Sequence, residues 1–150
     1  MKKSDFESMV EKAFWGLEAK YGFKKTDTAY VDRTCKIQFE NATTAILLNY
    51  ELGNRPWLEI SDVHDASNKS TLGWLMVELG KDKAPTPQQA FQPPALKKEE
   101  LYPALEQMGR EILEYGSDLL TGNFALMPKL QVRAKKYDQE CQRYLAQHKA

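Results

Sequence analysis

Three runs of alternating apolar and polar residues follow one another between residues 31 and 63. In the first run, Cys35, Ile37 and Phe39 alternate with polar residues. A side-chain period of two is typical of a strand with one buried face. The other two runs have the same period and follow short turns rich in Asn, Gly and Pro. Leu47 interrupts the polar side of the second run, which favours a central strand. This stretch therefore predicts a three-stranded antiparallel meander.

The residues before and after this stretch have the 3.6-residue period of helices. Apolar side chains at helical spacing predict a helix over residues 4–21. Ser4 and Glu7 have the spacing of a capping box at its start, and Gly22 is placed to end it. Residues 71–79 fit a short helix or a fourth strand, and we prefer the helix.

Two segments lack either period. Residues 65–70 are predicted to be a loop, and residues 81–95, which contain four prolines, an extended connector. Helices are predicted over residues 99–115 and from Pro128 onward. We therefore expect a single α+β domain over residues 1–150. It has an N-terminal helix, a three- to four-stranded antiparallel β-meander and C-terminal helices packed on one face of the sheet.

Composition excludes some classes of partner. Lys plus Arg and Asp plus Glu both number 21, so the formal net charge is zero. Bulk charge therefore gives no argument for nucleic acid or anionic membrane, and we expect neither partner. No apolar run is long enough to cross a bilayer, and the first residues lack the apolar segment of a secretory signal. Cys35 and Cys141 have no paired spacing, which indicates reduced thiols in a cytoplasmic protein.

Asp62, His64 and Asp65 form the one cluster that resembles a chemical site. On a strand, Asp62 and His64 would project from the same face, as two metal ligands could. No third ligand, reactive nucleophile or phosphate-binding glycine loop accompanies them. We therefore predict no catalytic residue, no metal and no cofactor. The alternative hypothesis is a small-ligand or metal-binding domain, with or without enzymatic activity, that uses Trp57, Asp62 and His64.

Charge is unevenly distributed along the chain. Residues 40–65 contain five acidic residues and one basic residue, and residues 97–118 contain six acidic and three basic residues. Residues 129–150 contain six basic and two acidic residues. One interpretation is that the basic last helix packs beside an acidic helix or sheet edge.

The other interpretation is an acidic surface that binds a basic protein partner. Trp57 would be its aromatic anchor, and Glu59, Asp62 and Asp65 would attract the partner. A homo-oligomer formed through the sheet edge or the last helix is a third, structural hypothesis.

Four short motifs occur in order along the chain: Tyr21-Gly22-Phe23, Phe39-Glu40-Asn41, Asn49-Tyr50-Glu51-Leu52 and the loop Leu119–Phe124. In this layout the chain resembles small uncharacterised bacterial α+β proteins that are similar to immunity proteins of polymorphic and contact-dependent toxin systems. The loop resembles a Leu-Leu-x-Gly-Asp-Phe pattern, with Asn123 in place of the Asp. The resemblance implies a cytoplasmic, non-catalytic protein that neutralises a cognate toxin, such as a basic toxin domain, by covering its site.

Overall fold

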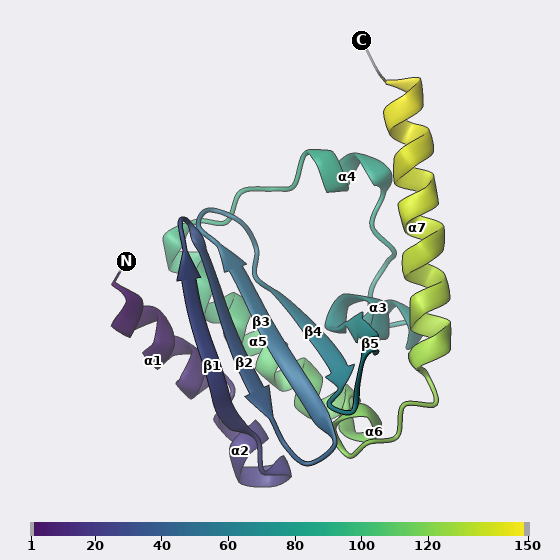
Figure 1. Ribbon diagram of the computed structural model, residues 1–150. Helices are drawn as coiled ribbons and strands as arrows, with labels where there is room; N and C mark the ends of the chain where they lie inside the picture. The colour runs from purple at the N-terminus through teal and green to yellow at the C-terminus, as the bar shows by residue number, and fades with distance from the viewer. Residues whose placement is uncertain (1, 149–150) are drawn as a thin grey trace.

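The computed structural model describes residues 2–148. Within them, five strands form one antiparallel sheet in the order β1-β2-β3-β4-β5. The strands are β1 (Lys24–Val31), β2 (Thr34–Glu40), β3 (Thr44–Glu51), β4 (Trp57–Asp62) and β5 (Asp65–Thr71). The helices are α1 (Lys3–Ala13), α2 (Trp15–Tyr21), α3 (Leu72–Glu78), α4 (Pro87–Phe91), the 3-10 turn η1 (Lys98–Glu100), α5 (Leu101–Tyr115), α6 (Ser117–Leu120) and α7 (Met127–Gln147). The predicted α+β class is confirmed (Figure 1).

The prediction of three to four strands is wrong, because both edge strands were missed. β1 lies before the stretch in which strands were predicted, and β5 occupies a segment expected to be a loop. Most residues of β1 and β5 are exposed or half-buried, so neither strand needs alternating apolar side chains. Their backbones pair with β2 and β4, which supplies the hydrogen bonds that define them.

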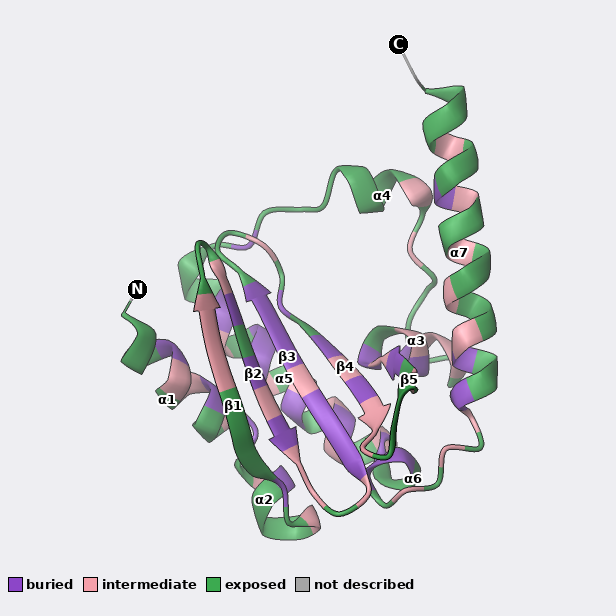
Figure 2. Ribbon diagram, in the orientation of Figure 1, coloured by how far each residue is buried: buried purple, intermediate pink, exposed green. Residues whose placement is uncertain are grey.

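The sheet has a helix-covered face and an uncovered face. Figure 1 shows α1, α2 and α5 on one side of the sheet, with α7 standing beside β5. The core between these layers includes Phe6, Leu48, Leu105 and Ile112, all nearly inaccessible to solvent. Buried positions recur along β2 and β3 (Figure 2). The face turned toward the viewer carries no helix among residues 2–148.

The first helical segment differs from the single helix predicted over residues 4–21. The helix is interrupted at Phe14, where φ is −108° and ψ is 15°. The predicted capping box is also wrong, because Lys2 is the N-cap and no side chain caps the helix. The predicted ending is confirmed: Gly22 has a left-handed φ of 71° and its N–H donates to the carbonyl of Glu18.

A close helix crossing lies at the end of α1. A Cβ atom added to Gly109 of α5 would lie 2.2 Å from the carbonyl oxygen of Ala13. A glycine is therefore needed at this point for α5 to approach the end of α1. Gly16 plays a weaker part, because its added Cβ would meet only the side chain of Leu113.

The proline-rich segment 81–95 is not wholly extended as predicted, because it contains α4. This segment packs on α7: the Phe91 ring stacks on Tyr144 at 5.8 Å between centroids, and the Tyr137 hydroxyl donates to the carbonyl of Thr86 at 3.0 Å. At its far end, the N–H of Leu96 donates to the carbonyl of Gly53 at 2.9 Å. The segment thus links α7 to the β3–β4 turn.

α7 covers the β5 edge of the sheet. The side-chain amide of Gln131 donates to the carbonyls of Ser67 and Lys69 on β5, each at 3.1 Å. Arg133 forms an ion pair with Glu78 of α3 at 2.6 Å. The basic helix therefore packs beside the sheet edge, but that edge is not acidic as predicted, because β5 carries one acidic and one basic residue. Among residues 2–148, no helix combines the length and apolar character needed to cross a membrane.

Candidate functional site

The uncovered face of the sheet, called here the open face, is the first candidate. It consists of the strand side chains that alternate with the core positions: Lys24, Asp27, Ala29, Val31, Thr34, Lys36, Gln38, Glu40, Ala45, Leu47, Asn49, Glu51, Trp57, Glu59, Ser61, Lys69 and Thr71. Two large apolar side chains are conspicuous on it: Val31 is 65% exposed and Trp57 is 49% exposed. β2 and β3 separate Val31 on β1 from Trp57 on β4, so the two do not form one apolar patch. Trp57 is the more notable of them, because tryptophan is frequent among the residues that anchor protein interfaces.

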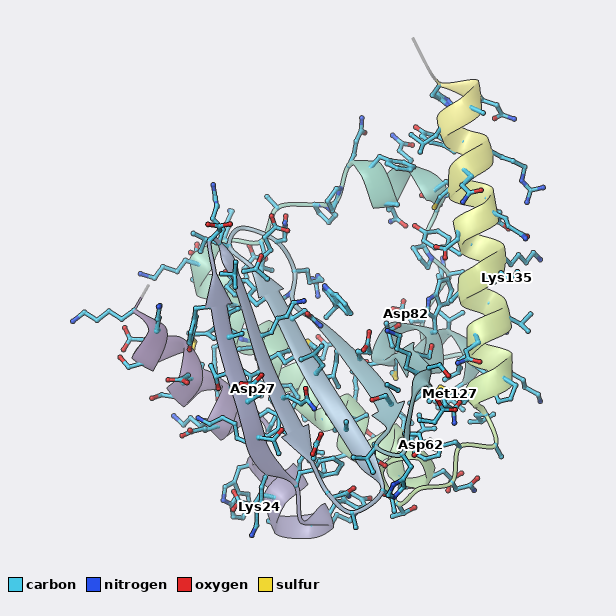
Figure 3. The ribbon with its side chains drawn as sticks, viewed as in Figure 1. Lys24, Asp27, Asp62, Asp82, Met127 and Lys135 are labelled. Atoms are coloured by element: carbon cyan, nitrogen blue, oxygen red, sulfur yellow. The ribbon has the colours of Figure 1, made fainter. Side chains whose placement is uncertain are left out.

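The four predicted partner-binding residues do not all lie together. Trp57 and Glu59 are two residues apart on β4, so both belong to the open face. Asp62 and Asp65 lie at the other end of β4, at the β4–β5 turn, where Figure 3 places Asp62. Five residue steps along a strand separate Trp57 from Asp62 by roughly 16 Å.

The two turn aspartates have local structural partners. Asp62 accepts a hydrogen bond from the N–H of His64 at 2.9 Å. Asp65 accepts from both the N–H and the hydroxyl of Ser67, which lowers the pKa of its carboxyl. These bonds stabilise the turn. The roles of both aspartates are therefore explained by the turn itself, with no need for a bound protein.

His64 is exposed in the same turn. No group of three or more His, Cys, Asp or Glu side chains in the described part of the chain is arranged to hold a metal ion. The alternative hypothesis of a ligand or metal site around Asp62 and His64 therefore gains no support from the geometry.

A second candidate lies beside Trp57. Thr71, the last residue of β5, pairs with Glu59, so β5 does not reach Trp57 and Leu58. The chain turns into α3 at Leu72, and a cavity of about 290 Å³ remains between β4, α3 and α5. Its apolar wall is formed by Leu58, Leu72, Met76 and Met108. Trp57 and Thr71 line it as well, so the cavity adjoins the open face.

Three charged side chains also line this cavity, called here the Trp57 cavity. Arg55 comes from the β3–β4 turn, Asp82 from the segment after α3 and Glu111 from α5. Asp82 lies near α3, well apart from Asp62 (Figure 3). Burial raises the pKa of the Glu111 carboxyl, and the charge of Asp82 raises it further, against opposing effects of Gln107, Arg110 and Arg55.

Sequence reasoning found Trp57 but not Asp82 or Glu111 as neighbours of it. The three residues come from separate parts of the chain, and no regular sequence spacing connects them. The acidic character of residues 97–118 is a sequence signal for Glu111, and none marks Asp82.

The Glu111→Gln variant is expected to be more stable than the wild type at pH 7. A carboxyl whose pKa is raised in the folded state contributes stability below its ordinary pKa of 4.5, and this stability is lost as pH rises through the raised pKa. Glutamine has no charge to desolvate. Urea unfolding at pH 7 and pH 4 should show the advantage of the variant shrinking at pH 4. A constant difference at both pH values would contradict this account of Glu111.

The two cysteines offer no reactive thiol. Cys35 and Cys141 are both free and buried. Burial raises the pKa of the Cys35 thiol, which reduces its thiolate fraction at neutral pH. Cys35, Tyr30 and Tyr50 line a second, smaller cavity of about 190 Å³.

Comparison of the chain with protein-family models, with curated proteins and with solved structures gives no match. The resemblance to immunity proteins is therefore a hypothesis that depends on the motifs and their order.

Proposed function

We propose that this chain is a non-catalytic protein-binding module that binds a partner with a basic surface through its open face. The observation that carries the proposal is Trp57: a large aromatic side chain, half exposed, on a sheet face without a helix. Binding energy in protein interfaces is concentrated in a few such anchors, with Trp among the most frequent.

The charges near Trp57 support a basic partner. Glu59 shares the open face with Trp57, and Asp82 and Glu111 line the cavity beside it. Arg55 is the one basic residue lining that cavity. Complementary charge steers association and disfavours wrong partners. Glu59 also pairs with Lys69 at 3.9 Å, and elsewhere the open face carries both signs of charge. The attraction for a basic partner therefore comes mainly from Asp82 and Glu111.

Immunity-type binding is the specific form of this proposal. An immunity protein acts by occupying a surface of its toxin and needs no chemistry of its own. The resemblance in the order of motifs and the partner-binding features around Trp57 are both in accord with such a role. Co-expression with toxin genes adjacent to the native gene tests it, because an immunity protein restores growth.

The Trp57→Ala variant is expected to lose partner binding. The tagged wild type should retain one protein from its native cell, and calorimetry with that purified protein should then give the affinity. Removing an aromatic anchor costs about 2 kcal/mol or more, which is roughly a 30-fold weaker affinity. Co-purification followed by titration calorimetry measures the effect.

The matched control is Trp15→Ala on α2. Trp15 is 68% exposed, more than Trp57, but belongs to the helical layer. The Trp15→Ala variant should bind the partner with the affinity of the wild type. Equal losses in both variants would indicate nonspecific adhesion to exposed tryptophan. Full affinity in Trp57→Ala would exclude the open face around Trp57 as the binding surface.

A further inference from the structure

The lining of the Trp57 cavity is largely apolar and suits the aliphatic part of a long side chain. Leu58, Met76 and Met108 line it, together with Trp57. Its volume of about 290 Å³ is just below the range for drug-sized ligands, which suits a single side chain. Methionine side chains adapt their shape to different occupants.

The charged side chains of the cavity form no close ion pair with any described residue. None of the ion pairs within 4.0 Å in residues 2–148 involves Asp82, Glu111 or Arg55. The hydrogen bond of the Asp82 carboxylate is to the N–H of its neighbour Lys83. Two carboxylates and one guanidinium therefore line the same cavity with a net negative charge. Glu111 is half-buried, whereas Asp82 and Arg55 are exposed. Burial makes the charge of Glu111 costly, so this carboxylate gains most from an added counter-charge.

We propose that the Trp57 cavity receives a Lys or Arg side chain of the partner protein. The aliphatic stem packs on Met76, Met108 and the Trp57 ring, and the cationic end lies between Asp82 and Glu111. Basic side chains bury their stems in this way while the charged end finds a polar partner. A cation near an indole face gains a further attraction.

This inference rests on the proposed function, because the cavity adjoins the open face at Trp57 and Thr71. A partner on that face can reach the cavity without moving any strand. An anionic ligand fits less well, because Arg55 is outnumbered by the two carboxylates. A hard metal ion such as Ca²⁺ needs six to eight oxygen ligands, and no described residues are arranged as such a cluster.

N-acetyl-argininamide is the probe that tests the cavity directly. In ¹H–¹⁵N spectra of the labelled protein, its addition should shift the indole N–H of Trp57 and the backbone N–H of Gly73 and Met76. N-acetyl-norleucinamide, which has an apolar stem and no charge, should bind at least about tenfold more weakly, the loss expected for one charge-assisted contact. Equal binding of the two probes, or shifts scattered over the surface, would overturn the inference.

Glu111→Gln and Asp82→Asn should each weaken binding of the argininamide about tenfold. Glu106→Gln is the matched control, because Glu106 lies on the same helix but pairs with Arg110 at 2.9 Å. The affinity for the argininamide should also fall as pH is lowered, because Glu111 then becomes protonated. The charged groups that act on the Glu111 carboxyl are Asp82, Arg55 and Arg110. Unchanged affinity in Glu111→Gln would exclude the cationic site.

The partner experiment separates the two proposals. If the partner binds Glu111→Gln as tightly as the wild type but fails to bind Trp57→Ala, the open face is the interface and the cavity inference is wrong. If the argininamide binds in the cavity and no partner is retained, the cation site is supported and the proposed function is wrong.

Discussion

Replacing Gly109 by alanine is expected to lower the free energy of unfolding by about 3 kcal/mol, at the upper end of the usual cost of overpacking. The added Cβ would lie 2.2 Å from the carbonyl oxygen of Ala13, far inside van der Waals contact. That oxygen belongs to the backbone and cannot rotate away as a side chain can. α1 and α5 must therefore separate, which loosens the packing of Phe14 beside them.

Two other helical glycines calibrate this result. Gly73→Ala in α3 should be neutral or stabilising by up to about 1 kcal/mol, because alanine favours helices and the nearest atom lies at 3.7 Å. Gly16→Ala should fall between the two, because the flexible end of Leu113 can move. Urea unfolding measures all three. Gly109→Ala and Gly73→Ala with equal stability would show that the α1–α5 crossing adjusts without cost.

Asn41→Ala is expected to lower the free energy of unfolding by about 2 to 3 kcal/mol, as the loss of several half-buried hydrogen bonds predicts. Its side-chain amide donates to the carbonyls of Tyr21 and Leu120 at 3.1 and 3.0 Å. Its side-chain oxygen accepts from the N–H groups of Thr43 and Thr44 at 3.0 and 2.8 Å. One side chain thus joins the β2–β3 turn to the ends of α2 and α6.

Asn123→Ala is the control for Asn41→Ala. Asn123 is exposed and its side chain accepts one local bond, from the N–H of Ala125 at 3.1 Å. Its replacement should cost less than about 1 kcal/mol. Thermal unfolding followed by circular dichroism compares the two variants. Similar melting temperatures would mean that the Asn41 bonds are replaced by water without loss.

These contacts explain the loop Leu119–Phe124 in structural terms. Thr44 donates a hydroxyl hydrogen bond of 2.6 Å to the carbonyl of Leu119. Gly122 has a φ of 91°, and a Cβ there would lie 2.9 Å from the Cβ of Thr43. The glycine is needed both for the left-handed backbone and for the close approach to the β2–β3 turn. The loop motif is therefore accounted for by the fold.

The central strands and the main helices were predictable because burial imposes a period on the sequence. β2 alternates as read from Ile37, and β3 is buried on both faces, as expected of a central strand. The helix preferred for residues 71–79 is present as α3. The first helix was predicted without its interruption at Phe14, because that interruption coincides with a contact to α5. A contact between distant segments leaves no local pattern.

The site was predictable only along one strand. The alternation of β4 correctly places Trp57 and Glu59 on one face, because a strand has a period of two. It could not show that Asp82 and Glu111 meet Trp57 at a cavity, since the turn from β5 into α3 creates that space.

The sequence by itself therefore determined the α+β class, the central strands and the exposed side of β4. Each follows from a period that burial of one face imposes on neighbouring residues. Only the tertiary structure decided the edge strands β1 and β5, the crossing at Gly109 and the charged cavity beside Trp57. These depend on backbone pairing and on contacts between residues far apart in the chain, which no local period encodes.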